Sequence, residues 1–109
     1  MIDLAPTYLV ELFLPIASNG GQPFERQLFD CVRDELLETF GGVTLFSRSP
    51  AEGLWAAGEP GGASCDQMIA VEVMTDAIDA AWWTDYRTQL QDRFSQREVL
   101  IRCHQVTKL

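Results

Sequence analysis

Two carboxylates, two arginines and one histidine stand at alternate positions of short apolar segments, and these side chains could do chemistry. They are Glu11, Arg48, Glu72, Arg102 and His104. Imidazole titrates where acid–base catalysis operates, so His104 is a candidate base that Glu11 or Glu72 would orient. Arg102 would then hold an anionic group of the substrate. The same charges are also interpreted as cross-strand pairs in a sheet, with His104 structural.

We predict no metal centre, no cofactor and no activated nucleophile. Cys31, Cys65 and Cys103 lie far apart and form no Cys-x-x-Cys or Cys/His cluster, so a zinc site is not expected. No serine or cysteine has a base beside it that would activate it. We interpret Cys31 and Cys103 as small buried hydrophobes and Cys65, in a glycine-rich loop, as accessible. An odd number of separated cysteines fits a reducing cytoplasm.

Length and charge narrow the function further. The chain has 109 residues, which suits a single domain, here residues 1–109. Its net charge of −8 and its single lysine argue against nucleic acid and anionic membranes as partners. The apolar run Tyr8 to Leu14 is too short to span a bilayer, and no basic leader precedes it. We therefore expect neither a membrane helix nor a signal peptide.

A repeated template predicts the elements that position the charged side chains. In each half, apolar residues at steps of three, four and four follow a β-rich run and precede a second strand-like run. The two stripes are Phe29, Val32, Leu36 and Phe40, and then Trp83, Tyr86, Leu90 and Phe94. We interpret each repeat as a strand-helix-strand unit.

Turn and capping signals set the expected boundaries. Pro23 lies in the first turn of a helix that stops at Gly41-Gly42, and Thr75 or Asp76 caps a second helix running to about Ser95. The strands are expected at 8–14, 43–48, 67–74 and 97–106, with a short extra strand or hairpin arm at 53–56. Residues 1–6 are interpreted as a loose lead-in, and residues 58–66 as a mobile loop.

The order β-α-β-β-α-β predicts an α+β, ferredoxin-like plait. In that fold a four-stranded antiparallel sheet in the order 4-1-3-2 has both helices on one face. Strand alternation turns the purely aliphatic side chains toward the helices. The opposite face, here called the open face, mixes charged and apolar side chains. They are Leu9, Glu11, Phe13, Phe46, Arg48, Met68, Glu72, Met74, Leu100, Arg102 and His104.

The open face has too many apolar side chains to be left fully exposed to solvent, and too many charged ones to form a second buried core. We therefore expect a ligand or a partner to cover it. One interpretation is a homodimer interface joined by the charge pairs. The other is a ligand pocket between this face and a partner, with Glu11, Arg102 and His104 as polar anchors. Glu72, Arg48, Phe13, Phe46 and, at the rim, Trp55 would complete that pocket.

The tryptophans and the helix acids have competing interpretations. Trp83 continues the core stripe, whereas Trp82, on its flank, either packs helix to helix or binds a partner. Trp55 either lids the core or lines a pocket. The acids of the helices are interpreted as a solvated face: Asp30, Asp34, Glu35, Glu38 and Asp92.

Three segments resemble a pattern of small bacterial proteins of unknown function. They are residues 42–45, 53–55 and 94–100, which correspond to a Gly-x-Thr strand, a Gly-x-Trp segment and a Phe-x-Gln-x-x-Val turn. The resemblance covers about the C-terminal two-thirds of the chain and implies a ferredoxin-like fold, but it assigns no activity or site residue. The resemblance does not extend to the N-terminal segment, because those relatives often have export signals and none is expected here.

The layout also resembles the dimeric α/β-barrel superfamily, in which two plaits pack their sheet faces together. That superfamily contains cofactor-free monooxygenases, small isomerases, haem proteins and plain binding domains. The resemblance is therefore compatible with several functions and selects none of them.

We therefore predict a cytoplasmic homodimeric binding or interaction domain, with a small-molecule pocket at the open face. The alternative is a cofactor-independent monooxygenase- or isomerase-like enzyme, with His104 as base, Glu11 orienting it and Arg102 holding an anion. A third reading is a structural or regulatory interaction module that uses Trp55 and Trp82.

Overall fold

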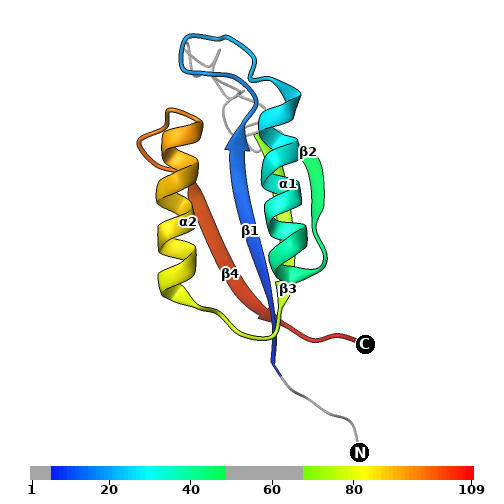
Figure 1. Ribbon diagram of the computed structural model, residues 1–109. Helices are drawn as coiled ribbons and strands as arrows, with labels where there is room; N and C mark the ends of the chain where they lie inside the picture. The colour runs from blue at the N-terminus through cyan, green and yellow to red at the C-terminus, as the bar shows by residue number, and fades with distance from the viewer. Residues whose placement is uncertain (1–5, 49–67) are drawn as a thin grey trace, which may run out of the picture.

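A computed structural model of the chain describes residues 6–48 and 68–109 and has the predicted order of elements (Figure 1). They are β1 (Thr7–Pro15), α1 (Arg26–Phe40), β2 (Thr44–Arg48), β3 (Met68–Thr75), α2 (Ala80–Arg93) and β4 (Leu100–Val106). The four strands form one antiparallel sheet in the order β2-β3-β1-β4, and both helices cover the same face. The predicted ferredoxin-like α+β layout and strand order are confirmed.

Several predicted features lie outside the described residues. They are the extra strand at 53–56, the loop at 58–66, and most of the lead-in at 1–6. In the part of the chain that the structure describes, β4 is an edge strand, paired only with β1.

Both helices begin later than predicted, because the residues just before them adopt a non-helical backbone. Pro23 lies in an isolated bridge with Ala17, and α1 begins only after Glu25, which has an extended backbone. The cap of α2 is Asp79, whose carboxylate accepts a hydrogen bond from the Trp82 amide at 3.2 Å. The prediction that Thr75 or Asp76 caps this helix is therefore wrong.

The ends of the helices follow local backbone chemistry. Gly41 has a left-handed backbone with φ of 82°, and its amide donates to the Leu37 carbonyl at 2.8 Å, as predicted for the glycine pair. The second helix ends at Arg93, close to the prediction. The strand β4 begins at Leu100 instead of 97, because the Val99 amide donates to the Gln91 side chain and not to a strand.

The core lies between the helices and the sheet, as strand alternation and the two stripes predict. Val10, Leu12 and Leu14 of the central strand β1 are at most 1% exposed. Phe94, the last residue of the second stripe, is fully buried, and its ring lies 5.1 Å from Phe24 and 5.3 Å from Phe29 between centroids. Aromatic packing of this kind adds to the free energy of burial.

Trp82 belongs to an aromatic cluster between the helices. Its ring stacks on Tyr86 at 5.0 Å between centroids and meets the edge of Phe40 at 5.2 Å. Trp83, only 7% exposed, stacks on Phe40 at 5.2 Å between centroids. The structure thus favours the packing interpretation of Trp82 over the partner-binding one.

The predicted burial of two cysteines is wrong, since both are exposed and free. Cys31 lies beside the narrow stripe of α1, of which only Val32 and Leu36 are buried. Cys103 faces the helices near the start of α2, where the small side chain of Ala80 leaves a hollow of about 190 Å³. The third cysteine, Cys65, lies outside the described residues.

One acid of the predicted solvated face instead joins the two helices. Glu35 of α1 accepts two hydrogen bonds from Arg93 of α2, both at 2.6 Å, and one from the Tyr86 hydroxyl at 2.9 Å. The hydrogen bonds from Arg93 outweigh desolvation and lower the pKa of Glu35. Burial, together with the bond to Glu35, raises the pKa of Tyr86, which keeps its hydroxyl as a donor.

We predict that Glu35→Gln lowers the free energy of unfolding by about 1 kcal/mol at neutral pH, because a partly buried bidentate pair is lost. The pKa of Glu35 is lower in the folded protein than its ordinary value of 4.5. Its stabilisation is therefore complete above pH 4.5 and is lost as the pH falls through the depressed folded pKa. Urea unfolding at neutral and acid pH measures the effect.

The matched control is Glu38→Gln, at an exposed residue of the same helix. The control is expected to match wild type at both pH values. Equal losses in the two variants, or a Glu35→Gln deficit that persists in acid, would contradict the role of the clamp.

Candidate functional site

The register of the central strand assembles the predicted charged cluster on the open face. Glu11 of β1 lies opposite Arg102 of β4 on one side and opposite Glu72 of β3 on the other. His104 lies one pair further along β4, opposite Leu9. Residues opposite one another in an antiparallel sheet share a face, so all of these side chains lie on the face without helices.

Glu11 and Arg102 form the predicted ion pair. The Arg102 Nε donates to Glu11 Oε1 at 3.0 Å, and the guanidinium carbon lies 5.0 Å from the centroid of the Phe13 ring. Glu11 is only 8% exposed, whereas the Arg102 side chain is 56% exposed. The carboxylate therefore lies beneath the guanidinium, which it holds against the sheet while leaving it accessible to solvent.

His104 is close to this pair but does not complete a catalytic dyad. Its Nδ1 lies 4.0 Å from Glu11 Oε1, the same oxygen that accepts from Arg102. That separation is longer than a hydrogen bond, so Glu11 does not fix the orientation of the imidazole. The side chain is 56% exposed, so the imidazole is in contact with solvent.

Within the charged cluster of the open face, Glu72 has no ion-pair partner among the described side chains. It is half-buried and lies between Glu11 of β1 and Thr44 of β2 in the sheet register. Like charges directly opposite one another are unfavourable. The bond from Arg102 neutralises Glu11 and so reduces this repulsion, but Glu72 still lacks a cation among the described side chains.

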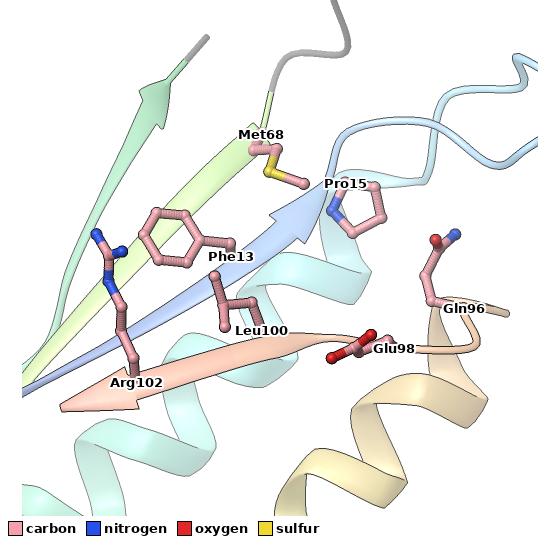
Figure 2. Close-up of a pocket in the computed structure, with 7 residues that line it drawn as sticks. All are labelled: Phe13, Pro15, Met68, Gln96, Glu98, Leu100 and Arg102. Carbon is pink, nitrogen blue, oxygen red and sulfur yellow. The ribbon is translucent and has the colours of Figure 1, made fainter. Parts of the chain in front are cut away.

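A hollow of about 470 Å³ lies at one end of the open face, where β1 ends and β3 and β4 begin (Figure 2). Its lining residues are Phe13, Pro15, Met68, Gln96, Glu98, Leu100 and Arg102. Arg102 and Phe13 lie together at one end of the hollow, while Glu98 lies at the other end, just before the start of β4, with Leu100 between them (Figure 2). The hollow is apolar in the middle and carries opposite charges at its two ends.

The hollow contains only part of the predicted site. Phe13 and Arg102 line it, but Glu11, Glu72 and His104 do not. The sequence analysis did not assign Pro15, Gln96 or Glu98 to a site. A sequence signal for Glu98 was present, because Glu98, Leu100 and Arg102 are spaced by two residues. Alternate residues of an extended chain point to the same face.

The remaining predicted residues lie on or beyond β2. The backbone register pairs Phe46 with Ala70 and Arg48 with Met68. Their side chains, and the whole of Trp55, lie outside the described residues.

The described residues show neither a metal cluster nor a membrane span. Among residues 6–48 and 68–109, no three His, Cys, Asp or Glu side chains gather closely enough to hold a metal ion. Neither α1 nor α2 has the length and apolar character needed to cross a bilayer.

Comparison with known proteins adds no family assignment. No model of a known protein family matches the chain, and a search of curated proteins finds no match either. The resemblance to small bacterial proteins stays a prediction, so function is argued from the geometry of the open face.

We predict that Arg102→Leu lowers the free energy of unfolding by about 1–3 kcal/mol, because it leaves the carboxylate of Glu11 buried without its donor. Adding Glu11→Gln removes the unpaired charge, so the double variant is expected to recover part of the loss. Urea unfolding at one fixed protein concentration measures the cycle.

The control is Arg97→Leu, at an exposed arginine that precedes β4. An Arg102→Leu variant no less stable than this control would show that the ion pair contributes nothing to the fold.

Proposed function

We propose that the chain is a homodimeric binding domain in which two copies pack their open faces together and leave room for a small molecule. The observation that supports this most directly is exposed apolar surface on a face that no described helix covers. Met74 is 53% and Leu100 49% exposed there. Soluble monomers rarely leave such a surface uncovered.

The charges on the face support a second copy as the partner. Among the described side chains Glu72 has no cation partner, while the side chains of Arg102 and His104 are each 56% exposed. A two-fold axis brings each of these groups of one copy over the face of the other, so the same pattern supplies both carboxylate and cation. The Glu11–Arg102 pair can enter such an interface more readily than a single charge, because neither group is left without its partner.

The proposal includes a reducing, cytoplasmic setting and a bacterial source. Support for the setting comes from Cys31 and Cys103, which are exposed and unpaired. The bacterial source rests on the resemblance of the three sequence segments described above. The acidic charge of −8 argues against nucleic acid as the partner of this face.

We predict that the wild-type chain sediments as a dimer at micromolar concentration and that Met74→Glu weakens dimerisation at least about tenfold. A new carboxylate on this face meets the acidic groups of the mate and loses water on burial. Sedimentation equilibrium measures both constants.

Leu37→Glu is the matched control, because Leu37 is 46% exposed but lies on α1, on the helix side of the sheet. It is expected to dimerise like wild type. A monomeric wild-type protein sinks the proposal, and equal weakening by Leu37→Glu moves the interface away from the open face.

The alternative function, a cofactor-independent enzyme with His104 as base, is favoured by one observation. The imidazole lies 4.0 Å from the carboxylate of Glu11, on the face where a mate would exclude water. However, His104 does not line the hollow, so the substrate would have to bind elsewhere on the face. We therefore rank this function second.

For this enzyme we predict faster deuterium exchange at the α-carbon of simple ketones, followed by NMR in D₂O. His104→Gln is expected to abolish the acceleration without changing the dimer. Ketones that exchange at the solvent rate with wild-type protein, or equally fast with His104→Gln, exclude His104 as base for this chemistry.

A further inference from the structure

The hollow on the open face has the composition of a small-molecule site. Phe13, Pro15, Met68 and Leu100 give it an apolar floor and walls, and the polar groups stand only at its ends. Its volume, about 470 Å³, lies in the range typical of ligand pockets. What it binds is therefore set by the two end groups, Arg102 and Glu98.

Arg102 is a prepositioned donor at one end of this hollow. Its Nε is used by Glu11, and its guanidinium lies over the Phe13 ring, so two contacts fix its plane. Its two terminal nitrogens donate no hydrogen bond to any described residue. A guanidinium held in this way presents a pair of donors to a planar acceptor, and a carboxylate has the matching geometry.

Glu98 at the other end of the hollow determines how a charged ligand is oriented. A carboxylate ligand is repelled from Glu98 and attracted to Arg102, so its body must lie along Leu100 toward Met68 (Figure 2). A doubly charged phosphate is disfavoured, because Arg102 is the only cation among the described residues that line the hollow and the whole chain has a net charge of −8.

We infer that this hollow binds small monocarboxylic acids with an aromatic or aliphatic body, with the carboxylate on the terminal nitrogens of Arg102. The inference names the ligand class of the proposed binding domain and so rests on the proposed function. The Glu11 carboxylate acts as the positioning group, since it touches the arginine and not the ligand.

The test compares three probes of equal size on the full-length, ¹⁵N-labelled protein: 4-phenylbutyrate, 4-phenyl-1-butanol and 4-phenylbutylamine. We expect the carboxylate to shift the amide signals of Phe13, Leu100 and Arg102, with about tenfold tighter binding than the alcohol and still weaker binding of the amine. An alcohol or amine that binds as tightly as the carboxylate, or shifts confined to other residues, overturns the inference.

Variants then test the assignment to Arg102. Arg102→Gln is expected to weaken the carboxylate about tenfold and to leave the alcohol unchanged. Arg97→Gln removes the same charge from an exposed neighbour outside the hollow and is expected to bind like wild type. Equal losses in both variants mean that general charge, not the Arg102 fork, attracts the acid. The three-probe comparison on wild-type protein decides the ligand class even where Arg102→Gln disturbs folding.

Sedimentation of the same samples separates this inference from the proposed function. A dimer that does not bind 4-phenylbutyrate contradicts the ligand class but leaves the proposed dimer intact. A monomer that binds 4-phenylbutyrate through Arg102 overturns the dimer alone.

Discussion

The pairing of β1 with both of its neighbours is the constraint on which the rest of the structure depends. Because β1 lies between β3 and β4, its register decides at once which side chains enter the core and which charges meet on the open face. Val10 and Leu12 are buried under the helices, while Glu11 between them is opposite Arg102. A slip of one residue would exchange these faces and bury the carboxylate in the helix layer.

The parts that the sequence could predict are those set by periodicity. Alternation along β1 separates Leu12 from Glu11, and the two apolar stripes identify the buried faces of the helices. The rules for connecting strands and helices in a compact domain then predict the strand order and the two layers. The Glu11–Arg102 pair also follows, because strand order places these two residues side by side. Residue type and parity were sufficient for each of these predictions.

The features that the sequence could not predict depend on contacts between distant side chains. Glu35 has the pattern of a surface acid, and only the meeting of α1 with α2 gives it Arg93 as a partner. Cys103 has the parity of a core residue, but the small side chain of Ala80 at the start of α2 leaves it exposed. The hollow likewise forms where the ends of separate strands converge. Parity with Arg102 indicates the face of Glu98, but no local feature of Pro15 or Glu98 indicates that convergence.

The exposed edge at β4 has a consequence for how the protein behaves in bulk solution. This strand leaves main-chain hydrogen-bonding groups on its outer side without a strand partner in the described part of the chain, and such edges template association between molecules. At neutral pH the net charge of −8 keeps molecules apart. Near the isoelectric point of about 4.4 that repulsion vanishes. The hydrogen bonds from Arg93 lower the pKa of Glu35, so Glu35 keeps its charge to lower pH than an ordinary carboxyl group, and acid that removes the repulsion between molecules does not first remove this link between the helices.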